Sequence, residues 1–247
     1  GCEILHNLVT GSKHEGIFHF FEASSMRKIK DKYVLIYSRM SPAGEYGLPE
    51  SNYNLAYAYS DHPLGPFTYG GLIIDGRARD VDENGKIIPT AYPGGNTHGS
   101  IQEINGQWWV FYHRQTGTDE YSRQAMVAPI TVDVQEGPGG KVTISEGEYT
   151  SEGFSTDGLN PLNKSAAGWA CYLTNPKGIK QEYPNFFFTG SYIKAVRIDL
   201  ESYAGPFNLK QPFSPVVNNT SGSVVGYKYF NFDHTAAMKS IDFTAHI

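Results

Sequence analysis

Phe20–Arg39 reads FFEASSMRKIKDKYVLIYSR, and Asn96–Arg114 reads NTHGSIQEINGQWWVFYHR. The second stretch repeats the first in register when Ser25 is aligned with Ser100. The same alignment pairs Ile29 with Ile104, Tyr33 with Trp108, Tyr37 with Tyr112 and Arg39 with Arg114. Agreement at a fixed spacing indicates an internal repeat, which is typical of folds assembled from similar supersecondary units.

Alternation of apolar and polar residues, interrupted by turn residues, predicts two sets of four β-strands. The first set is expected at 20–29, 32–39, 52–60 and 67–74, and the second at 97–104, 107–114, 122–133 and 141–145. Four antiparallel strands per repeat are typical of a β-propeller blade. We therefore expect an all-β fold, with two blades of an incomplete propeller in residues 1–145. The alternative is that the two sets are hairpin units of a β-sandwich.

The repeat is lost after about residue 146. Residues 146–180 are rich in Gly, Ser, Asn and Pro and are predicted to form a connector. Residues 181–247 return to short aromatic and β-branched runs, so 146–247 is predicted to be a connector and the start of a β-sandwich accessory domain. Alternatively, these strands complete the propeller. Residues 75–96 are predicted to form a long polar loop with one short hairpin at Asn84-Gly85.

Composition excludes several classes of protein. The 247 residues carry a net charge of −5 and contain no basic run, which argues against a nucleic-acid partner. No run of about 18 apolar residues is present, so no transmembrane helix is expected. The only cysteines are Cys2 and Cys171, which cannot form a disulfide framework or a thiolate metal cluster.

Two polar residues stand at the start of the repeats, where the first strand of each blade would line the central channel. Glu22 follows Phe20 and Phe21, and partial desolvation there would favour a neutral carboxylic acid that can act as a general acid. The alternative is a structural glutamate paired with Arg27 or Arg123.

His98 is expected to enter the same channel from the second repeat. A neutral imidazole there could ligate a metal, bind a sugar hydroxyl or orient an acid. The alternative is an ordinary hydrogen-bonded histidine, because no second ligand stands at metal-ligand spacing.

Several separate motifs in residues 15–145 resemble the later blades of a family 43 glycoside hydrolase. They are Phe20–Lys28, Tyr57–Gly71, Asn96–Ile101, Trp108–Arg114 and Ser122–Ile130. The resemblance implies a five-bladed propeller that acts on arabinose- and xylose-containing plant polysaccharides by an inverting mechanism. The run Val224–Phe232 is similar to a β-sandwich often appended to such enzymes.

Carried over position by position, the resemblance implies that Glu22 is the general acid. His98 matches a channel histidine that sits beside a central calcium ion and its waters, and Arg123 matches a basic residue that binds sugar hydroxyls or holds a carboxylate. The catalytic base and a third carboxylate would come from earlier blades, supplied in cis or as a second chain. We therefore expect negligible hydrolysis by this chain alone. The nearby acidic residues are expected to be solvated loop charges: Asp75, Asp80, Asp82 and Glu83.

The sequence thus favours a glycosidase whose substrate is a carbohydrate, placed outside the cell or in the periplasm because the substrate is a polymer. One alternative is a non-catalytic carbohydrate-binding or scaffold protein that keeps the channel without cleaving sugar. Another is a furanosidase or phosphorylase propeller of a different family.

Overall fold

A computed structural model of the chain describes residues 17–48, 50–76, 80–81, 84, 87–88, 97–116, 122–174, 181–182, 187–188, 191–194 and 214–235. These ranges contain β-strands, turns and three short 3-10 helices, at Glu45–Gly47, Ala167–Trp169 and Phe232–Thr235. The predicted all-β class is confirmed. No helix in these ranges is long and apolar enough to cross a membrane.

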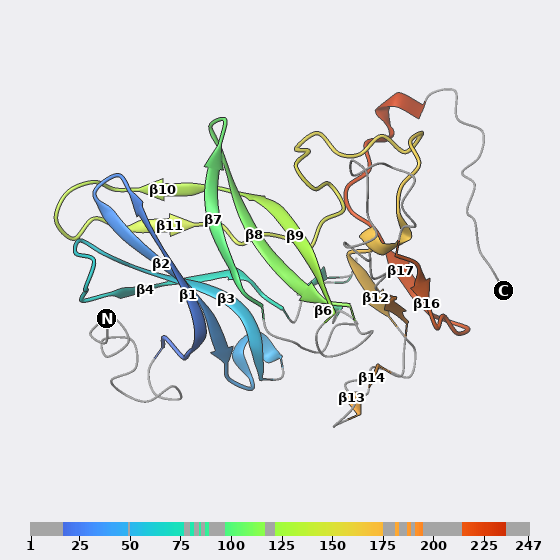
Figure 1. Ribbon diagram of the computed structural model, residues 1–247, viewed down its shortest axis with the longest axis horizontal. Helices are drawn as coiled ribbons and strands as arrows, with labels where there is room; N and C mark the ends of the chain where they lie inside the picture. The colour runs from blue at the N-terminus through green and yellow to red at the C-terminus, as the bar shows by residue number, and fades with distance from the viewer. Residues whose placement is uncertain are drawn as a thin grey trace, which may run out of the picture.

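The first repeat forms one four-stranded antiparallel sheet (Figure 1). Its strands are β1 (Phe20–Ile29), β2 (Lys32–Ser41), β3 (Ser51–Ser60) and β4 (Thr68–Ile74), hydrogen-bonded in chain order. All four lie where the sequence predicts them, to within two residues at each end. This sheet has the strand number and order expected of a propeller blade.

The second repeat differs from the prediction. The strands β7 (Gly99–Ile104), β8 (Gln107–Gln115) and β9 (Arg123–Ile130) form a three-stranded sheet. The strand predicted at 122–133 is divided, because β10 (Val132–Val134) pairs instead with β11 (Val142–Ile144) in a separate hairpin. The prediction of a second four-stranded sheet is therefore wrong.

The division follows from where β8 begins. Asn105 and Gly106 have φ values of 53° and 82°, and they form the tight turn that starts β8 at Gln107. Because Trp108 pairs with Ile130, β9 has almost no partner strand left beyond that residue. The chain then pairs with β11 instead.

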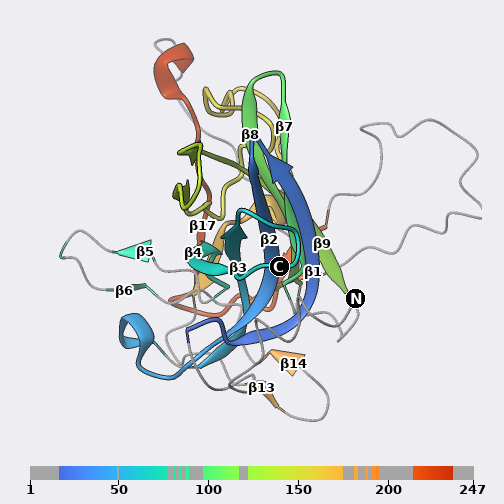
Figure 2. The same cartoon turned by 90° about the vertical axis from the view of Figure 1, so that its left-hand side faces the viewer.

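The main core lies between the two sheets, and β7 lies beside β1 and β2 (Figure 2). Alternate residues of each strand point into it and are fully buried, among them Val34, Ile36, Leu55 and Ile73 from the first sheet and Ile101, Val110 and Ala128 from the second. Burying each of the larger aliphatic side chains stabilises the fold by roughly 1.5–3 kcal/mol. The packing fixes the first strands of the two repeats against each other.

The β10–β11 hairpin is attached to the first sheet. The hydroxyl of Tyr57 on β3 accepts a hydrogen bond from the backbone N–H of Ile144 at 3.0 Å. At the tip of the hairpin, Asp61 accepts a hydrogen bond from the N–H of Gly139 at 2.8 Å. Asp61 also pairs with the ammonium group of Lys32, which is buried on β2 and donates to the carbonyl of Gly137. The hairpin therefore ties the second repeat to the outer turns of the first.

The described part of the C-terminal region consists of two-stranded pieces. They are β12 (Tyr172–Thr174) with β17 (Val224–Gly226), β13 (Gln181–Glu182) with β14 (Phe187–Phe188), and β15 (Tyr192–Ile193) with β16 (Val216–Val217). A small core of Ala170, Leu173 and Ile193 lies among them. Earlier in the chain, β5 (Asp80–Val81) pairs with β6 (Ile87–Ile88), as expected for a hairpin at Asn84-Gly85.

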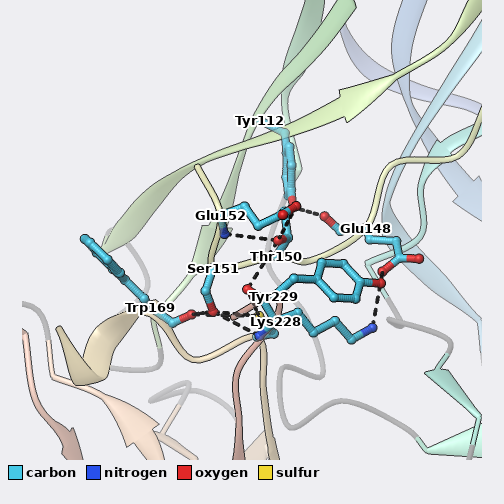
Figure 3. Close-up of polar contacts among 9 residues, drawn as sticks. Tyr112, Glu148, Thr150, Ser151, Glu152, Trp169, Lys228 and Tyr229 are labelled. Atoms are coloured by element: carbon cyan, nitrogen blue, oxygen red, sulfur yellow. Dashed lines mark hydrogen bonds and ion pairs between the residues drawn. The ribbon is translucent and has the colours of Figure 1, made fainter. Parts of the chain in front are cut away.

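Residues 146–174 are held against the second sheet by buried polar contacts. The guanidinium group of Arg114 on β8 donates to the carbonyl of Ala170 at 2.5 Å and to that of Cys171 at 3.3 Å. Nearby, the Ser151 hydroxyl donates to the carbonyl of Trp169 at 3.0 Å and accepts from the N–H of Lys228 at 3.1 Å (Figure 3). The stretch predicted to be a connector is thus packed against β8 over part of its length.

Candidate functional site

Glu22 lies on an irregular part of β1. The pairing of β1 with β2 shifts register on both sides of Glu22, which is opposite Ser38, and the next residue, Ala23, has a φ of 44°. A β-bulge bends its strand and re-aims a side chain, and strained non-glycine backbone is often found at functional sites. The side chain of Glu22 is 39% exposed, so it remains accessible to a ligand.

The structure brings His98 into contact with Glu22. The Nε2 atom of His98, which directly precedes β7, is hydrogen-bonded to Oε1 of Glu22 at 2.9 Å. The two residues come from different repeats and are 76 positions apart in the chain. The next residue, Gly99, has no room for a side chain, because a Cβ atom there would lie 2.4 Å from the backbone oxygen of Phe111 on β8. The sequence prediction that both residues share one region is in agreement with this geometry.

A third residue, His113 on β8, extends this group. Its Nε2 atom accepts a hydrogen bond from the backbone N–H of His98 at 3.2 Å, and the two imidazole rings meet edge to face with centroids 5.2 Å apart. Burial, followed by the nearby His98 and Arg123, lowers the pKa of His113 to about 4. His113 is therefore a neutral hydrogen-bond acceptor at neutral pH.

Sequence reasoning missed His113 as a site residue. The motif Trp108–Arg114 contains it, and the repeat alignment places it at the position equivalent to Ser38. A position that is serine in one repeat and histidine in the other gives no pattern of its own. Only the folded arrangement shows that both side chains reach the same segment of backbone.

The remaining predicted residues lie around this group. Arg123 is the first residue of β9 and is partly buried, close enough to His113 for its charge to act on that ring. Arg27, one of the two partners considered for Glu22, instead donates to Ser25 and to the backbone carbonyl of Ile101. A hydrogen bond of 2.9 Å between the hydroxyl groups of Ser25 and Ser100 completes the contact between β1 and β7.

One of the acidic loop residues differs from the expectation. Asp75, directly after β4, is only 3% exposed, so it is not a solvated charge. It follows a fully buried strand end, Ile73 and Ile74, which carries it into the interior. Asp82 and Glu83 lie outside the described residues, as does the side chain of Asp80.

The donors around His98 do not by themselves fit a calcium ion. Calcium takes about six to eight oxygen ligands, whereas the Nε2 atom of His98 is already bonded to Glu22. Within the described ranges, no three His, Cys, Asp or Glu side chains are grouped so that they could hold a metal.

The arrangement of Glu22, His98 and His113 is instead suited to proton transfer and to hydrogen bonding with a polar ligand. A carboxyl group held through one oxygen keeps the other free to carry or release a proton.

Comparison with known proteins gives a consistent set of relatives. No family model matches the chain. The chain is 31% identical over 222 residues to a xylosidase/arabinosidase of Thermoclostridium stercorarium, an alignment that covers 90% of this chain and 42% of that protein. It is also 34% identical over 118 residues to a β-xylosidase of Xylanibacter ruminicola, which covers 47% of this chain and 29% of that protein.

Among solved structures, the chain is similar to a family 43 β-xylosidase/α-arabinofuranosidase from a compost microbial metagenome. The identity is 28% and the TM-score 0.31, over 50% of this chain and 29% of that one. That structure was determined with xylotriose bound and in a calcium-free form. The chain therefore spans less than half the length of each of these relatives.

Proposed function

We propose that this chain, which is related to the xylosidases and arabinosidases of glycoside hydrolase family 43, supplies the proton-donating part of an inverting glycosidase site. In this proposal Glu22 is the general acid, and the scissile bond joins xylose or arabinose to a larger saccharide. The observation that carries the proposal is the 2.9 Å hydrogen bond between Glu22 and His98, made at a bulge that leaves the carboxyl group partly exposed.

The geometry suits an acid that must hold one proton and then release it. With the His98 proton on Nε2, the imidazole donates to Oε1 of Glu22 and fixes the orientation of the carboxyl group. Oε2 then carries the proton that protonates the leaving glycosidic oxygen. Loss of that proton leaves a carboxylate, which the same His98 N–H stabilises because hydrogen bonds to charged acceptors are stronger.

Binding of the sugar is assigned to the polar groups around this pair. Arg123 supplies fixed N–H donors beside His113, and such donors bind hydroxyl groups or a carboxylate. The exposed part of the His98 ring offers an additional contact to a hydroxyl group.

An inverting reaction also needs a carboxylate base about 6.5–9.5 Å from the acid, with a water molecule between them. We propose that this base comes from a further segment, in the same polypeptide or in a second chain, because the alignment spans only 42% of the Thermoclostridium relative. The chain alone is then expected to hydrolyse glycosides negligibly. A calcium ion near His98, if one binds, would take its ligands largely from that further segment or from water.

The test is complementation. The chain is fused to the part of the Thermoclostridium relative that lies outside the aligned segment, and the fusion is assayed on xylotriose, 4-nitrophenyl β-xyloside and 4-nitrophenyl α-arabinofuranoside. The proposal expects hydrolysis by the fusion, release of the inverted anomer as seen by proton NMR, and negligible hydrolysis by the fusion that carries Glu22→Gln on the unactivated xylotriose. Saccharide binding without hydrolysis by a folded fusion would instead support a carbohydrate-binding module.

A further inference from the structure

One peptide group, the bond between Thr97 and His98, is held from both ends by side chains. Its carbonyl oxygen, which belongs to Thr97, accepts a hydrogen bond from the hydroxyl of Ser38 at 2.5 Å. Its N–H, which belongs to His98, donates to Nε2 of His113 at 3.2 Å. This peptide lies directly before β7 and carries the imidazole that contacts Glu22.

The two side chains that hold this peptide occupy the same position in the two repeats. The alignment that pairs Ser25 with Ser100 also pairs Ser38 on β2 with His113 on β8. Ser38 is fully buried and lies opposite Glu22 in the β1–β2 register. The peptide is therefore fixed between the second strands of two neighbouring sheets, and the first of these sheets also carries Glu22.

The hydrogen bond from the N–H of His98 defines the tautomer of His113. Because Nε2 accepts the N–H of His98, the proton of the neutral ring stands on Nδ1. Nδ1 is buried and has no hydrogen-bond partner within the described ranges. A buried N–H without an acceptor is unfavourable, so this ring is kept in place against a penalty. The edge-to-face contact with the His98 ring offsets part of that penalty.

We propose that Ser38 and His113 are positioning residues that fix the Thr97–His98 peptide and thereby hold the His98 ring on Oε1 of Glu22. The effect of this pair on catalysis rests on the proposed function of Glu22, whereas its effect on the geometry does not. The rate of a reaction is sensitive to the placement of a catalytic group, since a displacement of about 1 Å can reduce the rate by about a hundredfold.

The first test reads the imidazole geometry directly, without any enzymatic activity. The full 247-residue chain is labelled with 15N-histidine, and the ring signals of His98 and His113 are recorded by long-range 1H–15N NMR for the wild type and for His113→Gln, His113→Leu, Ser38→Ala and Glu22→Ala. Glu22→Ala defines the signal of a His98 ring that has lost its partner. Gln at position 113 retains an acceptor where Nε2 was, whereas Leu removes it.

We expect the wild-type spectrum to show His113 protonated on Nδ1. We expect His113→Leu and Ser38→Ala to move the His98 signals toward those of Glu22→Ala, and His113→Gln to keep them near the wild type. If His98 keeps its wild-type signals in both His113→Leu and Ser38→Ala, the inference is overturned. If His113→Leu does not fold, the smaller Ser38→Ala change decides the question alone.

The second test uses the active fusion. His113→Leu is expected to reduce kcat by about tenfold to a hundredfold with less than about a twofold change in KM, and His113→Gln is expected to restore most of kcat. Equal losses in both variants would contradict a positioning role. If the wild-type fusion itself is inactive, the proposed function fails, and the NMR measurement still decides the inference.

Discussion

The hydroxyl groups of Ser25 and Ser100 are hydrogen-bonded at 2.9 Å, and these two serines hold equivalent positions, 75 residues apart, in the two repeats. Equivalent residues can meet in this way only if the first strands of the repeats converge. Arg27 strengthens the contact, since it donates both to Ser25 and to the backbone carbonyl of Ile101. The convergence that joins the serines also places Glu22 beside His98.

The serine contact is expected to show as a coupling in a double-mutant cycle. Ser25→Ala, Ser100→Ala and the double variant are compared by urea unfolding of the full chain. We expect a coupling free energy of roughly 0.5–1.5 kcal/mol, because a neutral hydrogen bond contributes about that much net stability. The matched control replaces the exposed neighbour Ser24 in place of Ser25. Coupling no larger than in that control would contradict the contact.

The pair Lys32–Asp61 predicts a loss of stability in acid. The hydrogen bond from Lys32, followed by that from the N–H of Gly139, holds the pKa of Asp61 below its usual value of 3.8. A carboxyl group with a lowered pKa in the folded state contributes stability that is present above 3.8 and is lost as the pH falls through and below that value. Asp61→Asn should therefore lose less stability than the wild type between about pH 5 and pH 3.

The measurement is urea unfolding at both pH values, repeated in a Lys32→Met background. There Asp61 has lost its ammonium partner, so Asp61→Asn should change the acid sensitivity much less. The same effect of Asp61→Asn in both backgrounds would show that Lys32 is not the cause.

Removal of the buried guanidinium group of Arg114 is expected to destabilise one particular segment of the chain. Arg114→Met keeps the length of the side chain but removes the donor to the carbonyls of Ala170 and Cys171, whereas the carbonyl of Gly168 keeps a second donor in Gln124. We expect a loss of about 2–3 kcal/mol in the free energy of unfolding and faster amide hydrogen exchange at residues 168–173.

The control for Arg114 is provided by the repeat. Arg39 is the equivalent buried arginine of the first sheet, and it donates to the carbonyl of Ile17 and to Glu45. Arg39→Met should therefore accelerate exchange near residues 17–19 and leave 168–173 as in the wild type. An identical exchange pattern in the two variants would mean that these arginines stabilise the fold only globally.

The strands of the first sheet could be predicted from the sequence because each is a local pattern. The continuous apolar run Tyr33–Tyr37 marks a buried strand within Lys32–Ser41, and the tight turns around Lys30-Asp31 and Asn105-Gly106 end strands wherever they occur. The break between β9 and β10 has no such local signal. It depends on the length of β8, the strand with which β9 pairs.

The candidate site was predictable in part, because the repeat that positions it is visible in the sequence. The repeat placed Glu22 and His98 at equivalent strand starts, so their proximity followed from the expected architecture. His113 could not be found in this way, since its role depends on a contact with the backbone of His98 rather than on a motif. The burial of Asp75 was likewise hidden, because a polar loop sequence gives no sign that its first residue remains in the core.

The central claim, that Glu22 donates the proton to the leaving group, is tested most directly by the dependence of the rate on the leaving group. In the active fusion, kcat is measured for Glu22→Gln and for the wild type on a series of aryl xylosides whose phenols range from strongly to weakly acidic. We expect a loss of orders of magnitude in kcat for weakly acidic phenols that shrinks toward the wild-type rate for 4-nitrophenol and more acidic ones. A loss of the same size on every member of the series would contradict it.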